Sequence, residues 1–137
     1  MKVLFICKSN VGRSQMADAF FNDLANEHAA ISAGTHVKSE NEGCPISKIT
    51  EKVTLCMREA ELEVADNIMN QLTEEVVDES DVVVAITPKD TLPEYLQTSS
   101  KLVVWNIPDA GGTDMDFHRK VRDMVKSGVE ELIKEIG

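Results

Sequence analysis

The alternation of apolar runs with amphipathic segments constrains the fold of this chain more than any other feature of its sequence. Residues 81–86 (DVVVAI) are apolar throughout after the first aspartate, which is typical of a strand buried on both faces of a parallel sheet. Residues 114–136 instead place Phe117, Val121 and Val125 at helical spacing. Strands that alternate with helices in this way predict an α/β fold, with right-handed crossovers and helices on both faces of a parallel sheet.

The same periodicities predict the remaining elements. Strands are expected at residues 2–7, 29–35, 81–86 and 101–107. Helices are expected at residues 14–27, 46–60, 73–80 and 114–136, and a further short helix begins within residues 87–96. Thr73 is expected to cap the helix that follows it. No repeat, low-complexity tract or Pro/Ser-rich linker interrupts the chain, so residues 1–137 are expected to form one domain.

Composition excludes several classes of function. The chain has 14 Lys and Arg residues against 24 Asp and Glu residues, a formal charge of -10, which disfavours nucleic-acid binding. It has no apolar run long enough to span a membrane, and the apolar stretch Val3–Cys7 is too short for a signal peptide. We therefore expect a cytoplasmic protein. Three cysteines without C-x-x-C spacing predict neither a disulfide framework nor a structural zinc site.

The segment FICKSNVGRSQMA (residues 5–17) carries the strongest chemical signal. Cys7 ends the first predicted strand, and ligands of such folds bind at the carboxyl ends of strands. A short loop then closes onto a helix, so its backbone N–H groups and the helix N-terminus can form an anion site. Arg13 can bind two oxygens of a phosphate-like ion, and Ser14 can hydrogen-bond the sulfur. The alternative is that Cys7 is a small core side chain and that Arg13 is a surface residue.

An anion site beside a thiolate would suit in-line displacement at phosphorus. The thiolate is the nucleophilic form of cysteine, and fixed donors can hold charge that spreads over equatorial oxygens in the transition state. Asn10 and Gly12 are residue types that tolerate the unusual backbone angles of such a loop.

The residues CKSNVGRS (7–14) resemble the C-x5-R-S phosphate loop of the low molecular weight protein tyrosine phosphatases and the related thioredoxin-coupled arsenate reductases. The resemblance covers nearly the whole chain. RSQMADAFFND is similar to the family's first helix, ISAGT to its second strand and turn, and WNIPDAGGTDMDFHRKVRDMV to its late loop and final helix. It implies a single-domain, three-layer α/β/α fold with a four-stranded parallel sheet in the flavodoxin-like order 2-1-3-4.

The resemblance also implies roles for individual residues. Cys7 would be the nucleophile, Arg13 would bind the oxyanion, and Asp109 would be the general acid that protonates the leaving oxygen and then activates water. Asn10 would organise the loop and Ser14 would support the thiolate. The phosphate-binding residues would be Lys8, Ser9, Asn10, Val11, Gly12, Arg13 and Ser14.

Asp109 has a structural alternative, because loop aspartates commonly hydrogen-bond nearby backbone. Asp114 and Asp116 lie close to it in sequence and are expected to cap or charge the start of the last helix.

The chain departs from the family pattern at four points. Ser9 replaces a frequent glycine, Gly12 replaces a frequent second cysteine, and Ala110 follows the aspartate where many relatives have proline. Tyr95 is the only tyrosine, so the late loop has no tyrosine pair to hold a phosphotyrosine ring. Trp105 is expected to be a core residue at a strand end.

The cysteines favour hydrolysis over arsenate reduction. Relatives that are thioredoxin-coupled reductases need two further cysteines in and after the third strand, where this chain reads DVVVAITPKDTLPEYL. Cys44 lies in a predicted loop and Cys56 on an apolar helical face. We therefore expect a cysteine-dependent phosphomonoester hydrolase, by resemblance a protein tyrosine phosphatase with a phosphocysteine intermediate. The alternative is an arsenate reductase that uses an external thiol or Cys44.

The expected partners are a phosphorylated protein or small phosphomonoester, with phosphate or arsenate in the loop and a thiol reductant if the chain is a reductase. No metal or organic cofactor is expected, because the loop would hold the oxyanion with fixed dipoles and one arginine. His28, His36 and His118 lack metal-binding spacing. His36 either borders the pocket or is simply exposed. Two non-hydrolytic alternatives stay open: an oxyanion-binding module, and a redox sensor that uses the thiolate of Cys7 with Cys44 as resolving partner.

Overall fold

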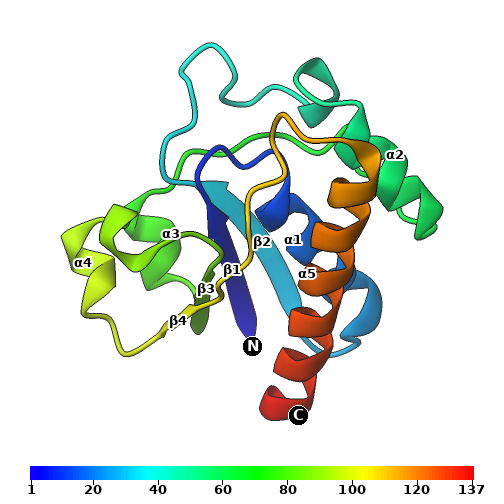
Figure 1. Cartoon of the computed structure of the whole chain (residues 1–137). Helices are drawn as coiled ribbons and strands as arrows, with labels where there is room; N and C mark the ends of the chain where they lie inside the picture. Colours follow the sequence, from blue (N-terminus) through cyan, green and yellow to red (C-terminus); the bar gives the residue numbers. More distant parts are fainter.

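The computed structural model describes residues 1–137 and confirms the predicted α/β fold (Figure 1). Its sheet consists of strands β1 (Lys2–Cys7), β2 (Ala29–Gly34), β3 (Val82–Ala85) and β4 (Leu102–Val104). All pairings are parallel, and the order β2-β1-β3-β4 is the expected one. The carboxyl ends of the four strands therefore meet at one edge of the sheet.

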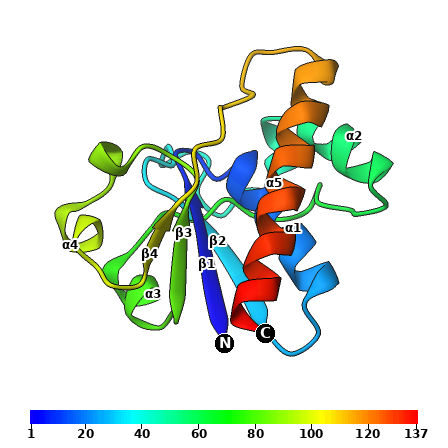
Figure 2. The same cartoon turned by 60° about the horizontal axis from the view of Figure 1, so that its bottom comes forward.

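Helices cover both faces of the sheet (Figure 2). Helices α1 (Arg13–Leu24), α2 (Lys52–Glu59) and α5 (Met115–Ile136) lie on one side, and α3 (Glu74–Asp78) and α4 (Glu94–Gln97) on the other. The Thr73 side chain accepts a hydrogen bond from the backbone N–H of Val76, which confirms the predicted cap of α3. None of the helices has the length and apolarity that a membrane span requires.

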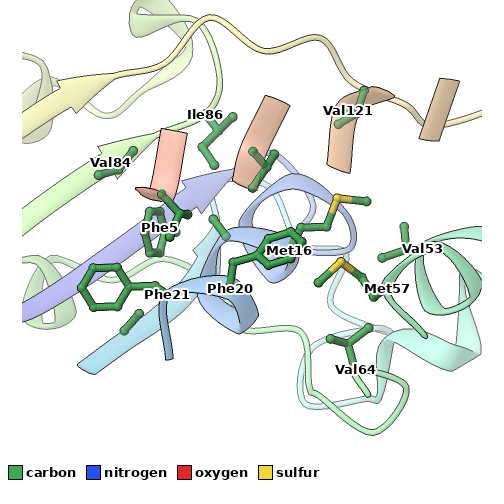
Figure 3. Packing of buried hydrophobic residues seen from close by; sticks show 14 of the residues in the cluster. Phe5, Met16, Phe20, Phe21, Val53, Met57, Val64, Val84, Ile86 and Val121 are labelled. Atoms are coloured by element: carbon green, nitrogen blue, oxygen red, sulfur yellow. The ribbon is translucent and has the colours of Figure 1, made fainter. Parts of the chain in front are cut away.

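Strand β1 separates two hydrophobic cores because its side chains alternate between the two faces. Val3 and Phe5 belong to the larger core, under α1, α2 and α5, whereas Leu4 and Ile6 belong to the smaller core, under α3 and α4. Figure 3 shows the larger core, where Phe5 lies among side chains of α1, β3 and α5. Burial on both faces explains why β1 and β3 read as continuous apolar runs, whereas Val103 and Val104 of the edge strand β4 are exposed.

The prediction of one helix over residues 46–60 is wrong. A single 3₁₀ turn spans Ile46–Lys48, and α2 begins only at Lys52. The backbone N–H of Ile46 donates to Asn67 O, and the Thr50 side chain accepts from the N–H of Val53. The bond to Asn67, which is distant in sequence, thus holds the first turn, and the Thr50 side chain binds a backbone N–H in the first turn of α2.

Two other elements end three residues before their predicted ends. Strand β4 ends at Val104 rather than at residue 107, although the N–H of Trp105 still donates to Ala85 O of β3. Helix α1 begins at Arg13 and ends at Leu24, three residues earlier than predicted. Trp105 packs against the larger core and its ring lies 5.8 Å from that of Phe5, which confirms its predicted place.

The carboxylate of Asp18 on α1 gives the fold a testable pH dependence. Burial raises the pKa of Asp18 from 3.8 to about 6, although its Oδ1 accepts a 2.6 Å hydrogen bond from Asn22. The folded state therefore holds this proton more tightly than the unfolded state does. The contribution of Asp18 to stability is therefore most favourable below the pKa of the unfolded state. It becomes less favourable as the pH rises through the pKa of the folded state.

We expect Asp18→Asn to raise the free energy of unfolding by about 2 kcal/mol above about pH 7, because no carboxylate is then buried. Below about pH 4 the gain should vanish. Urea denaturation at both pH values measures the difference, with Asp23→Asn, exposed on the same helix, as the control. A gain in the free energy of unfolding that is equal at both pH values would contradict the cost assigned to burying the Asp18 carboxylate.

Candidate active site

Cys7 lies at the floor of the loop formed by residues 8–12, which joins β1 to α1. Only 2% of the residue is exposed. Its Sγ lies 2.9 Å from Oγ of Ser14, a buried residue in the first turn of α1. Oγ of Ser14 also accepts a 2.8 Å hydrogen bond from Nδ2 of Asn10. Because that bond occupies a lone pair of Ser14, the hydroxyl proton is free to point at the sulfur.

Asn10 shapes the loop through both its backbone and its side chain. It is fully buried and adopts φ 58°, the left-handed conformation that asparagine tolerates better than most residues. While its Nδ2 holds Ser14, its Oδ1 accepts hydrogen bonds from Nε2 of Gln15 at 3.1 Å and from the backbone N–H of Asn70 at 2.8 Å. The predicted loop organiser therefore connects the loop, α1 and the segment before α3.

Gln15 belongs to this arrangement, and sequence reasoning missed it. Its buried Nε2 also lies within 3.1 Å of the Asn10 backbone oxygen and 3.0 Å of the Ile68 oxygen. The only signal in the sequence is a long polar side chain beside the apolar face of a helix. The bonds from Gln15 to Ile68 and from Asn70 to Asn10 join residues too far apart in the chain for a local pattern to reveal them.

The end of β2 supports the loop from below. Gly34 pairs in register with Cys7, and a Cβ at Gly34 would lie 2.7 Å from Lys8 O and 2.8 Å from Asn10 N. The next two residues hydrogen-bond the end of β1 and the start of the loop: Thr35 N donates to Cys7 O at 2.9 Å and His36 N donates to Lys8 O at 2.8 Å. The loop can take this path only because residue 34 has no side chain.

Arg13 and Asp109 face one another at the rim. The buried guanidinium of Arg13 donates from Nη1 to Ile107 O at 3.0 Å, and its Nη2 lies 4.0 Å from Oδ2 of Asp109. The Asp109 side chain is 69% exposed, and its Oδ1 accepts a 2.9 Å hydrogen bond from Gly111 N. Asp109 therefore accepts a hydrogen bond from nearby backbone, as its structural role predicts, and it also faces Arg13, as its catalytic role requires.

The segment that carries Asp109 is fixed without a proline at position 110. Ala110 is buried, and its oxygen accepts hydrogen bonds from the backbone N–H and the hydroxyl of Thr113. Nζ of Lys52, in α2, donates to Thr113 O at 2.6 Å. Asp114 caps α5 by accepting from Phe117 N at 2.9 Å, as predicted.

A cleft of about 680 Å³ opens above the loop. Its walls come from the loop and the segments that surround it: Lys8, Ser9, Val11, Gly12, Arg13, Met16, His36, Lys38, Asn41, Ile49, Thr50, Glu51, Lys52, Val53, Asp109, Ala110, Gly111, Gly112, His118 and Val121. No Phe, Tyr or Trp lines it, and Tyr95 lies on α4. The hydrophobic part of the wall is therefore aliphatic.

Two histidines line this cleft. His36 borders it, which was one of the two predicted positions. The buried His118 was missed; its Nδ1 lies 2.8 Å from Asp114 O and 3.2 Å from the Thr113 hydroxyl. A backbone carbonyl only accepts, so Nδ1 of His118 carries a proton.

The other two cysteines do not line the cleft. Cys56 is fully buried in α2, its thiol donates to Val53 O at 3.3 Å, and burial raises its pKa. Sγ of Cys44 lies 3.6 Å from Glu40 O and 3.9 Å from Nζ of Lys48. Neither thiol therefore lies in the walls around the loop.

The chain is similar to known phosphatases and arsenate reductases along almost its whole length. Residues 2–137 match the family described as low molecular weight phosphotyrosine protein phosphatase. The chain is 28% identical over 136 residues to the glutaredoxin arsenate reductase of Synechocystis sp., covering 98% of each chain. It is 25% identical to the protein-arginine-phosphatase of Bacillus subtilis, covering 99% of this chain and 97% of that one.

Solved structures show the same fold. An arsenate reductase in the phosphate binding state superimposes with a TM-score of 0.83 at 28% identity, over 99% of this chain and 98% of that one. A low molecular weight protein tyrosine phosphatase from T. tengcongensis superimposes with a TM-score of 0.85 at 24% identity, over 98% and 99% of the two chains.

The tight contact at Gly34 predicts the effect of a single methyl group. Gly34→Ala should displace the loop and weaken binding of inorganic phosphate by at least about tenfold, because the new Cβ meets two backbone atoms. Isothermal titration calorimetry measures the affinity. Gly128→Ala is the matched control, because its Cβ would lie 2.9 Å from the Trp105 ring, within the larger core. Equal affinity in Gly34→Ala and the parent would contradict the role of this contact.

Proposed function

Because this chain belongs to the low molecular weight phosphotyrosine protein phosphatase family, we propose that it is a cysteine-dependent phosphomonoester hydrolase with a phosphocysteine intermediate. One observation carries the proposal. Sγ of Cys7 lies 2.9 Å from the Ser14 hydroxyl at the floor of the loop, and Arg13 and Asp109 face each other at its rim.

In the first step, Sγ of Cys7 attacks the phosphorus atom and the bond from phosphorus to the leaving oxygen breaks. The Ser14 hydroxyl stabilises the thiolate before attack, because its proton is free to point at the sulfur. Asp109, in its protonated form, donates its proton to the leaving oxygen. The products of this step are the free alcohol or phenol and a phosphoryl group on Cys7.

In the second step, water attacks the phosphocysteine and the sulfur–phosphorus bond breaks. Asp109, now a carboxylate, takes a proton from the attacking water, so the acid of the first step is the base of the second. Inorganic phosphate leaves and the thiolate is restored. In both steps the loop N–H groups and the Arg13 guanidinium hold charge on the equatorial oxygens.

Phosphotyrosine in a protein is the substrate that the family description suggests for this chain. Its aryl ring would pack against the aliphatic wall provided by Val11, Ile49 and Val53, because no Phe, Tyr or Trp lines the cleft. A phosphorylated arginine, the substrate named for the Bacillus subtilis relative, is a different leaving group and is not the substrate that we propose.

Arsenate reduction is the second candidate, because several relatives of this chain are arsenate reductases. Its first step would use the same loop and thiolate. The following step needs a second thiol, and neither Cys44 nor Cys56 lines the cleft. A reductase built on this chain would therefore depend on an external thiol or on movement of the segment that carries Cys44.

A paired assay tests which reaction occurs. We expect hydrolysis of p-nitrophenyl phosphate, and we expect Cys7→Ser to lower kcat by at least about a thousandfold, because it removes the nucleophile. Arsenite formation from arsenate, with thioredoxin or glutaredoxin and glutathione, is measured on the same sample. Cys44→Ser is the control and should leave hydrolysis unchanged. Rapid arsenite formation with slow hydrolysis would favour the reductase instead.

A leaving-group series tests Asp109. Asp109→Asn should slow hydrolysis of phenyl phosphate by roughly a hundredfold and that of 2,4-dinitrophenyl phosphate by less than about tenfold, because only the poorer leaving group needs the proton. Steady-state kinetics at limiting substrate measures both rates. Asp116→Asn, in an exposed residue paired with Arg119, serves as the control. A small loss that is equal for both substrates would assign the acid to another group.

A further inference from the structure

The charge of the cleft is opposite to that of the molecule. Four of the chain's 14 Lys and Arg residues line it, whereas only two of its 24 Asp and Glu residues do. The four cations are Lys8, Arg13, Lys38 and Lys52. The chain as a whole carries a formal charge of -10, so positive charge is concentrated where the phosphoryl group is proposed to bind.

Three of these cations make no ion pair, and two of the three, Lys8 and Lys38, also make no side-chain hydrogen bond. Lys8 and Lys38 are exposed and form no salt bridge, whereas Arg13 faces Asp109 and Lys52 donates to Thr113 O. The loop and Arg13 suffice for one phosphoryl group in the proposed reaction. Lys38 enters the cleft from a different segment, so its charge is available to another group of the substrate.

The segment that carries Lys38 is anchored beside the loop. His36 N donates to Lys8 O, and Val37 N donates to Oε1 of Gln71 at 2.8 Å. Beyond them, the oxygen of Lys38 accepts hydrogen bonds from Asn41 N and Glu42 N, which close a turn. Figure 1 shows this segment, in cyan, extending past the carboxyl end of β2. The base of the Lys38 side chain is therefore fixed relative to the loop.

We propose that the substrate is a phosphorylated protein segment with acidic residues beside the phosphorylated one, and that Lys8 and Lys38 bind this acidic flank. The proposal rests on the proposed phosphatase activity and specifies its substrate. The cleft extends from the loop to residues 49–53, where Ile49 is 49% exposed and can pack against the peptide. The acidic surface outside the cleft would repel an acidic segment, whereas the basic residues of the cleft would attract it. The segment would therefore bind at the cleft.

The test compares two phosphotyrosine peptides of equal length, one flanked by Asp and Glu and the other by Asn and Gln. The acidic peptide should have a kcat/KM about tenfold higher at low ionic strength, as expected for one or two exposed charge pairs. The preference should shrink as salt is added, because exposed charges are screened. Lys38→Glu should abolish or reverse the preference. Lys134→Glu makes the same charge change near the C-terminal end of α5 and should keep it.

Binding gives a readout that does not depend on turnover. Cys7→Ser should bind the acidic peptide about tenfold more tightly than the neutral one, and the double variant with Lys38→Glu should lose this difference. Hydrolysis of both peptides at equal kcat/KM, with equal binding, would overturn the acidic flank and leave the phosphatase activity intact. Failure to hydrolyse p-nitrophenyl phosphate or either peptide would overturn the proposed function, and the acidic flank with it.

Discussion

The hydrogen bonds of the Asn10 side chain are the interaction on which the rest of the site depends. They join the loop to Ser14, Gln15 and Asn70, three residues that belong to α1 and to the segment before α3. Asn10 is fully buried and its φ is positive, so the loop conformation is held by these bonds against the ordinary backbone preference. The bond to Ser14 also orients the hydroxyl toward Cys7. One amide thus sets both the path of the loop and the surroundings of the sulfur.

The parallel sheet supplies the second constraint. Register pairs Cys7 with Gly34, so the end of β2 reaches the loop directly, and the absence of a side chain lets the two backbones approach. β1 is covered on both faces by hydrophobic side chains, which fixes its position between two cores. The site is therefore built on the end of a strand that is held between two cores.

The sequence was sufficient for the strands and for the loop because both depend on local patterns. Continuous apolar runs indicate burial on both faces, as found in β1 and β3, and a short loop between a strand and a helix limits where Cys7 and Arg13 can lie. The features that could not be predicted depend on contacts distant in sequence. The helix expected over residues 46–60 is interrupted where Ile46 bonds to Asn67, and Gln15 bonds to Ile68, 53 residues away. His118 lines the cleft because of how α5 packs, and its spacing in the sequence matches no motif that would have predicted this position.

Hydrolysis and arsenate reduction share the loop and the first attack, and they differ in what receives the group bound to sulfur. For hydrolysis the acceptor is water, and the proposed base, Asp109, lies at the rim with Oδ2 4.0 Å from Arg13. For reduction the acceptor is a thiol, yet Cys56 is buried in α2 and Cys44 lies outside the walls of the cleft. The basic residues around the loop do not distinguish the two oxyanions, because phosphate and arsenate present similar charge. What favours hydrolysis is therefore the second step, for which this chain has a carboxylate in reach of the cleft and no thiol.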